Sequence, residues 1–423
     1  MKKWIVGLLS AAMTLSLCAC SGLPDRLAAV QPRVAVEYPK AIGFEDYDAG
    51  RTVFEQNPVD DSFIETMAGF SWRTASAVLG SARGNANYSP LSLYFALALA
   101  GTGAGGQTQA QIFELLGTPS AEELSKQCGN LYRLLYKDNG VTKLKLANSL
   151  WMDRGVAFKD GFVRNAAGNF YASSYPVDFS GPSAGKAMGQ WVSQNTNGTL
   201  SPDFPVDGSK ILSILNTVYY RDEWMDRFDK AKTAKGVFHA PQGDVTVEYM
   251  NQTFGSGSFA KGDGFTRSSL GLKGARQMVF ILPDEGVGLD ELLASPERVR
   301  SLFAGEEGSH GEVVWKVPKF SFDCRYELAD VLKSLGVADA FRPDADFSGI
   351  TDGTAYITSV TQQTHIAIDE NGVEASAFTE IAYVGAAPPN GRAEMNLNRP
   401  FIYAITARGE TPLFVGVCSN PGE

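Results

Sequence analysis

Apolar and polar positions along this chain of 423 residues follow two different periods. Apolar residues three and four positions apart predict amphipathic helices at residues 60–79 and 107–116. Between them, residues 91–100 are apolar on every side, with Ser89 placed as an N-cap and Pro90 as the first helical residue. We therefore expect a fully buried helix at this point of the chain.

Other runs indicate a mixed protein of the α+β class. Alternating or short apolar runs predict strands at residues 144–152, 211–220, 277–282, 312–317 and 364–368. Helical spacing returns at residues 159–171, 184–196, 289–294 and 326–335. Near the end, residues 401–406 and 413–418 form a predicted hairpin that is too apolar for a sheet edge. Large mixed sheets around one buried helix are the expected architecture.

Composition limits the possible functions. With 44% hydrophobic residues the chain can bury a large core, as one big domain or two ordinary ones. A formal charge of -10 argues against a nucleic-acid partner, because phosphate binding needs clustered Lys and Arg.

The first twenty residues have the pattern of a targeting segment. Lys2 and Lys3 precede an apolar stretch, and Cys20 follows L-x-A. This pattern resembles a bacterial lipoprotein signal (1–20), which implies lipidation of Cys20 and anchoring at the cell surface or envelope. The alternative is a plain secretory signal cut near Cys20. Residues 21–58 lack sustained periodicity and are expected to form a tether.

Metal and disulfide chemistry have little support in the sequence. After Cys20 only Cys128, Cys324 and Cys418 remain, an odd number of widely spaced thiols that does not indicate a disulfide framework. No C-x-x-C or His-rich spacing predicts a metal site, and we expect no cofactor.

Two motifs resemble enzyme signatures. Residues 101–106 match G-x-G-x-x-G, but that fingerprint requires a preceding strand, and here a helix is predicted. Residues 181–185 match G-x-S-x-G around Ser183, but a hydrolase triad also requires a suitably placed histidine. The chain has only His239, His310 and His365, in unsuitable contexts. We therefore expect a protein that is not an enzyme, with an esterase as the weakest alternative.

The most informative stretch is D-E-N-G-V-E-A-S-A-F-T at residues 369–379. Gly372 gives backbone freedom at its start, and no proline occurs from residue 373 to 387, so the run could enter a sheet as a central strand. Small or β-branched residues share one face, namely Val373, Ala375, Ala377, Thr379 and Ile381. This segment resembles the reactive-centre loop of the serpins. The alternative is an ordinary edge strand followed by a surface loop.

The same resemblance recurs in order along residues 59–423. The motifs are N-x-x-Y-S-P-L-S at 85–92, L-A-N-S-L-W at 146–151, V-D-F-S at 177–180, W-V-S-Q-N-T-N-G at 191–198, L-N-T-V-Y-Y-R-D-E-W at 215–224, V-P-K-F at 317–320, A-D-F-S-G-I at 345–350 and N-R-P-F at 398–401. The resemblance implies one serpin domain with three β-sheets, about nine helices and an exposed reactive-centre loop at about 370–392.

The family's mechanism implies a suicide inhibitor of serine proteases, acting as a monomer. The protease cuts the loop and forms an acyl bond, and the cut loop then inserts into the main sheet. The family's spacing places the reactive bond at Ala386 and Ala387. The hinge that inserts first would comprise Glu370, Gly372, Val373, Glu374, Ala375, Ser376 and Ala377.

Residues before the reactive bond suggest the target class. Tyr383, Val384 and Gly385 precede Ala386, and no Lys or Arg occurs from residue 373 to 391. Small side chains suit the shallow pocket of an elastase-like or subtilisin-like protease. Chymotrypsin-like proteases and papain-like cysteine proteases remain alternatives through Tyr383 and Val384.

One departure from the family pattern concerns the polar cluster beneath the main sheet, here called the shutter. The family's histidine is replaced by Gln362, and His365 cannot substitute because it falls on the opposite strand face. Asn216, Ser89 and Ser92 are expected to pair with Gln362 instead. A non-inhibitory serpin acting as a surface binding or carrier protein remains the alternative function.

Overall fold

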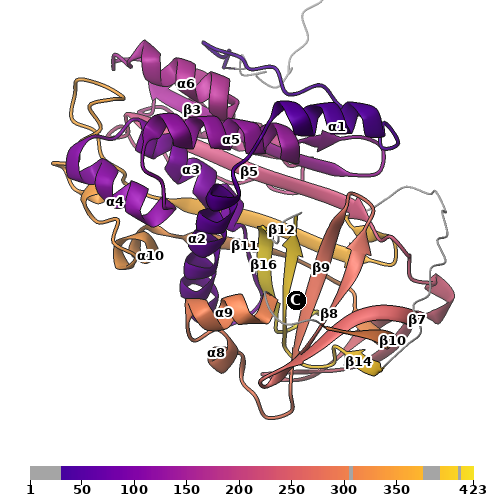
Figure 1. Ribbon diagram of the computed structural model, residues 1–423. Helices are drawn as coiled ribbons and strands as arrows, with labels where there is room; N and C mark the ends of the chain where they lie inside the picture. The colour runs from indigo at the N-terminus through magenta and orange to yellow at the C-terminus, as the bar shows by residue number, and fades with distance from the viewer. Residues whose placement is uncertain (1–29, 304–307, 375–390, 408–410) are drawn as a thin grey trace, which may run out of the picture.

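The computed structural model describes residues 30–303, 308–374, 391–407 and 411–423 (Figure 1). In these residues ten α-helices and two 3-10 turns accompany two hydrogen-bonded sheets. The helices are α1 (Tyr47–Gln56), α2 (Asp61–Gly80), α3 (Pro90–Thr102), α4 (Gly106–Leu116), α5 (Ala121–Leu135), α6 (Asp160–Phe170), α7 (Pro182–Asn195), α8 (Leu289–Leu292), α9 (Pro296–Phe303) and α10 (Ala329–Ser334). The α+β class is confirmed.

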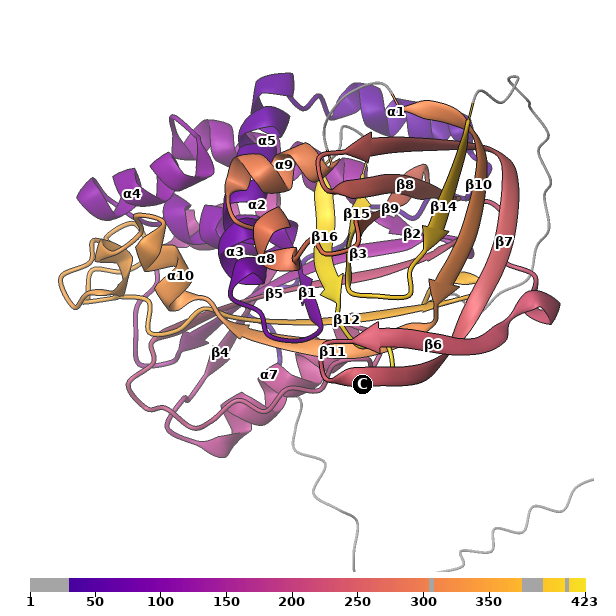
Figure 2. The ribbon, with the colours of Figure 1, turned by 90° about the horizontal axis from the view of Figure 1, so that it is seen from below.

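The sheet that carries the site has seven strands. Its order is β11 (Phe320–Glu327), β12 (Thr361–Asp369), β13 (Gly372–Val373), β5 (Leu212–Glu223), β3 (Lys143–Asp153) and β2 (Lys137–Asp138), with β4 (Ala172–Val177) paired to β3. Figure 2 shows α3 on one side of this sheet and α7 on the other. A small second core, which includes Trp151 and Trp191, lies between α7 and the sheet.

The other sheet has nine strands. Its order is β1 (Ala86–Tyr88), β16 (Pro412–Cys418), β15 (Phe401–Thr406), β9 (Arg276–Pro283), β8 (Phe265–Leu272), β7 (Gly243–Gly262), β10 (Ser309–Pro318) and β14 (Arg392–Asn396), with β6 (Ala234–Ala240) paired to β7. The serpin resemblance implied three sheets. Hydrogen bonds instead join the described strands into two, because the 20-residue β7 pairs in turn with β6, β10 and β8.

The buried helix predicted from the sequence is α3. Ser89 accepts a hydrogen bond from the Ser92 amide at 3.2 Å, and Pro90 occupies the first turn, where its missing N–H costs nothing. The helix contacts β5 of one sheet and β16 of the other, which explains why it is apolar all round. The predicted hairpin of β15 and β16 is also confirmed, with every residue of both strands buried inside the nine-stranded sheet.

The segment predicted as a tether is ordered where it is described. Val34 pairs with Ser174 of β4, and the Tyr38 ring stacks on Tyr136 at a centroid distance of 5.8 Å. The chain around Val34 and Tyr38 therefore lies against the body, and α1, which follows it and is described throughout, has no buried residue. The sequence carried a signal for this contact, since Val34, Val36 and Tyr38 repeat with the period-two spacing of an extended segment.

No helix in the described ranges is both long and apolar enough to cross a membrane. Cys128, Cys324 and Cys418 are free thiols, and burial raises the pKa of each. Within residues 30–423, apart from the undescribed segments, no group of three or more His, Cys, Asp or Glu side chains is arranged to hold a metal ion.

Candidate functional site

The hinge predicted from the sequence enters the seven-stranded sheet as a strand of two residues. Gly372 and Val373 form β13, which pairs antiparallel with β12 on one side and β5 on the other. Val373 is 2% exposed, so its side chain is buried on the face that the alternation assigned to the core. The sheet therefore already accepts the first residues of the segment.

Only glycine fits at position 372, because the backbone of β5 lies very close to it. A Cβ at this position would lie 2.1 Å from the Asp222 carbonyl oxygen, and the residue adopts φ +155. Any other side chain would force β13 away from β5. Gly372 therefore allows the backbone of β13 to approach β5 closely, in addition to the conformational freedom expected from the sequence.

The turn before β13 is held by residues at the ends of the two neighbouring strands, β12 and β5. Asp369 accepts a hydrogen bond from the Asn371 amide at 2.7 Å, as in an Asx-turn. The Trp224 indole donates to the Asp369 carbonyl oxygen at 2.8 Å, and the Trp224 amide donates to Asn371. Trp224, the residue directly after β5, thus fixes the point where the chain turns into the sheet.

Glu370 makes a buried ion pair within this turn. Its carboxylate lies 3.4 Å from the Lys319 ammonium and accepts a hydrogen bond from Thr233 at 2.8 Å. Burial alone would raise the pKa of Glu370, but the hydrogen bond from Thr233 and the Lys319 charge outweigh it, so the pKa is lowered. The sequence indicated Glu370 in the hinge and Lys319 in the V-P-K-F motif, but it did not indicate that they pair, nor the contact with Thr233.

Asp222 lies beside Val373 and is also buried. It accepts hydrogen bonds from Thr142 and Tyr220, each at 2.9 Å, and from the Gly274 amide at 3.0 Å. Burial raises the pKa of Asp222 despite these donors. Asp222 belongs to the family motif at 215–224, but the sequence did not indicate its burial, because an acidic residue at the end of an apolar strand is commonly solvent-exposed.

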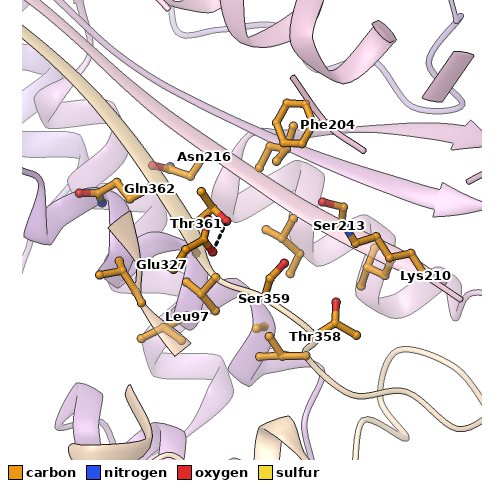
Figure 3. Close-up of a pocket in the computed structure, with 18 of the residues that line it drawn as sticks. Leu97, Phe204, Lys210, Ser213, Asn216, Glu327, Thr358, Ser359, Thr361 and Gln362 are labelled. Carbon is orange, nitrogen blue, oxygen red and sulfur yellow. Dashed lines mark hydrogen bonds between the residues drawn. The ribbon is translucent and has the colours of Figure 1, made fainter. Parts of the chain in front are cut away.

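Beyond β13, towards the N-terminal end of β12, the two neighbouring strands of the seven-stranded sheet are not hydrogen bonded to each other over the residues that the structure describes. In the described part of the chain no ladder joins β5 directly to β12, and β13 alone bridges them. We call this gap the seam. A cavity of 420 Å³ extends along it, lined by both strand edges and floored by residues of α3 such as Leu97 (Figure 3).

Three of the four predicted shutter residues line this cavity: Ser92, Asn216 and Gln362. Gln362 accepts a hydrogen bond from the Ser89 amide and donates one to the Ser89 carbonyl oxygen, both at 2.9 Å. The Ser89 hydroxyl turns away and donates to Leu413. The pairing of Gln362 with Ser89 therefore runs through the main chain.

Asn216 and His365 lie apart from this pair. Asn216 donates to Asn148 of β3 at 2.5 Å, and its buried carbonyl oxygen has no hydrogen-bond partner among the described residues. His365 lies on the opposite face of β12 from Gln362, against Asp323 of β11 at 2.5 Å. The carbonyl oxygen of Asn216 is thus, within the described residues, an unsatisfied acceptor on a residue that lines the cavity.

The two enzyme-like motifs lack the required context. Residues 101–106 follow α3 instead of a strand. Gly181 is the N-cap of α7 with Pro182 after it, so Ser183 lies in an ordinary first helical turn and not in a strained elbow.

Comparison with known proteins identifies the family. The model of the family described as "Serpin (serine protease inhibitor)" matches residues 65–421. The chain belongs to the serpin family. It is 32% identical over 354 residues to an uncharacterised serpin-like protein of Thermococcus kodakarensis, covering 80% of this chain and 81% of that one. It is 31% identical over 354 residues to serine proteinase inhibitor A3K of Cavia porcellus, covering 80% and 84%.

Solved serpin structures share the fold. The thermophilic serpin tengpin in its native state has a TM-score of 0.78 and 27% identity, covering 92% of this chain and 98% of tengpin. Thyroxine-binding globulin in complex with thyroxine has a TM-score of 0.74 at 23% identity, covering 84% and 100%. This second likeness shows that the serpin fold also occurs in a protein that binds a small molecule.

Several predicted site residues of this serpin lie outside the described residues. They are the hinge residues Ala375, Ser376 and Ala377, the specificity residues Tyr383, Val384 and Gly385, the reactive bond Ala386 and Ala387, and the lipidation residue Cys20. Of the predicted hinge, the structure describes Glu370, Gly372, Val373 and Glu374, and it places all four at the top of the seam.

Proposed function

We propose that this serpin is a suicide inhibitor of serine proteases, in which cleavage near Ala386 and Ala387 lets residues 374–383 fill the seam as a new strand. The observation that carries the proposal is β13, two residues already paired on both sides at the mouth of an otherwise open seam. An unpaired pair of strand edges is a template for one more strand.

The two registers of β13 predict where each inserted residue would lie. Val373 is opposite Ile368 of β12 and Asp222 of β5. Continuing both ladders assigns Thr379 to the row of Gln362 and Asn216. Its hydroxyl could donate to the carbonyl oxygen of Asn216 that has no partner in the described residues.

The next inward row shows the same chemical match. The registers assign Ile381 to the row of Ile214 and Val360, two apolar residues that line the cavity. A polar residue thus meets polar neighbours, and an apolar residue meets apolar ones, in consecutive inward rows. A one-residue shift would reverse every side chain, so this agreement supports the register.

A protease panel tests the proposed function. The body, residues 30–423, is incubated with an elastase and with subtilisin, and the products are separated in SDS. Inhibition by insertion predicts an SDS-resistant covalent adduct, whereas a carrier protein would be cleaved without an adduct or left intact. Chymotrypsin and papain belong in the panel, because Tyr383 and Val384 keep those classes open.

Two matched variants separate insertion from cleavage. Thr379→Arg places a charge on the inward face and should turn the inhibitor into a substrate, cleaved without adduct. Glu380→Arg changes the next residue, which the alternation places outward and which is already charged, so it should retain inhibition. Equal adduct formation by both variants would contradict strand insertion.

We further propose that the protein is lipidated at Cys20 and anchored at the bacterial cell surface or envelope. The support is the sequence pattern at residues 1–20. Cys20→Ser should move the protein from the membrane fraction to the soluble or secreted fraction. Cys18→Ser, two residues away, is the control and should remain membrane-bound, while equal fractionation of the two variants would contradict lipidation.

A further inference from the structure

The last described residue of the hinge, Glu374, has an unusual conformation. Its φ is +48, in the left-handed region that residues other than Gly, Asn and Asp seldom adopt. The conformation turns the chain out of the sheet immediately after β13, although the Glu374 amide still donates to Ala367 of β12 at 3.0 Å. Such a conformation persists where other contacts hold it.

The Glu374 side chain supplies contacts of this kind. Its carboxylate, 12% exposed, lies 3.5 Å from Nε2 of His365 on β12. The Tyr219 hydroxyl of β5 hydrogen bonds to the same carboxylate. A single side chain of the hinge therefore contacts both strands that border the seam, on the outward face of the sheet.

We propose that Glu374 is a positioning residue that clamps the hinge in its two-residue entry through His365 and Tyr219. The clamp would hold the bait loop ready without letting it enter further. This role rests on the proposed inhibitory function, because only an inserting loop needs such a restraint.

The registers show why the clamp must release before insertion. Continuing the two ladders of β13 places residue 376 in the row of His365 and Tyr219. Residue 374 itself falls two rows before this one, so its carboxylate extends forward along the seam to contact His365 and Tyr219 on the outward face. A strand that extends past residue 374 must displace that carboxylate, so the clamp and the inserted strand exclude each other.

Charged groups from three strands determine how the clamp responds to pH. Facing Glu374 are His365 of β12, Asp323 of β11, and Tyr219 and Arg221 of β5. Burial is the largest effect and raises the pKa of Glu374 to about 6, although His365, Tyr219 and Arg221 act in the opposite direction. The seated hinge thus binds the proton more tightly than a released one. Seating is strongest at acid pH and weakens as the pH rises through about 6.

Hydrogen exchange of the hinge amides, followed by mass spectrometry on the intact protein, tests the clamp without any protease. Glu374→Ala should speed exchange at residues 372–374 by about tenfold or more. Glu374→Gln keeps an acceptor for Tyr219 but carries no charge. It should remain protected and, unlike the wild type, should show no change in protection between pH 5 and pH 8 after correction for intrinsic exchange.

His239→Gln is the matched control. His239 pairs with Asp244 at 2.7 Å on the hairpin of β6 and β7, away from the seam, and its loss should leave hinge exchange unchanged. Wild-type exchange rates in Glu374→Ala, or a pH response that persists in Glu374→Gln, would overturn the clamp. Wild-type adduct formation is scored separately, so failure of the inhibitory function is distinguishable from failure of the clamp.

Discussion

Gln362 and Ser89 form a closed pair of hydrogen bonds between β12 and the start of α3, with both distances at 2.9 Å. The side-chain amide of Gln362 satisfies the amide and the carbonyl group of one buried residue. It thereby ties the β12 edge of the seam to the start of α3, which packs against the sheet.

Gln362→Ala should destabilise the intact protein by about 2 kcal/mol, because it leaves the buried Ser89 amide unpaired and removes one of the two donors to the Ser89 carbonyl oxygen, which also accepts from the Leu93 amide. The urea midpoint of the intact protein measures this loss. Gln363→Ala is the control on the outward face of the same strand and should shift the midpoint by less than about 0.5 kcal/mol equivalent. Equal midpoints for the two variants would show that the Ser89 contact contributes little.

Much of this architecture follows from local patterns in the sequence. Ser89 and Pro90 predicted the start of α3 correctly because an N-cap and a first-turn proline act through neighbouring backbone groups. The left-handed Gly117 likewise ended α4 as expected. The predicted helix at 326–335 was too long, since residues up to Glu327 belong to β11 and α10 spans only Ala329–Ser334.

The site was predictable only in part. Period-two alternation indicated Val373 as an inward residue, and the structure buries it. The contacts of Lys319, Thr233 and Asp222 were not indicated, although two of these residues stand in family motifs, because the contacts join residues about 50 to 150 positions apart. No local pattern specifies such pairs. The left-handed turn at Glu374 was also beyond local rules, since tertiary contacts hold it.

Glu370 predicts a pH dependence of stability. Its pKa is lowered in the folded protein, so its ion pair with Lys319 stabilises the fold above the ordinary pKa of a glutamate. That contribution is lost as the pH falls through the lowered folded value. Glu370→Gln should therefore be less stable than the wild type at pH 7, by about 1 to 2 kcal/mol, and the difference should vanish once the pH falls below the lowered pKa of Glu370. Melting curves across this range measure it, and a constant difference at all pH values would contradict the ionic role.

The predicted position of the reactive bond implies that one substitution there should change which proteases are inhibited. Ala386→Arg should make the protein an inhibitor of trypsin-like proteases, raising the association rate with trypsin by about 100-fold or more, because their primary pocket carries an acidic group. Inhibition of elastase should fall in the same variant. Tyr383→Arg is the control, since three residues before the bond it would not enter that pocket. If Gly385→Arg or Ala387→Arg inhibits trypsin better than Ala386→Arg, the bond lies one residue away.

Cleavage at the reactive bond should make the protein harder to melt. In the intact chain the seam leaves the edges of β5 and β12 unpaired beside a cavity of 420 Å³. Filling it with residues 374–383 would add hydrogen bonds on both sides and bury Thr379 and Ile381 against matching neighbours. Even at about 1 kcal/mol per hydrogen bond, the gain exceeds several kcal/mol and should raise the melting temperature by more than about 10 °C. Differential scanning calorimetry of intact and elastase-nicked protein measures this shift. Nicked Thr379→Arg should show no such rise, and an unchanged wild type would mean that the severed loop stays outside the sheet.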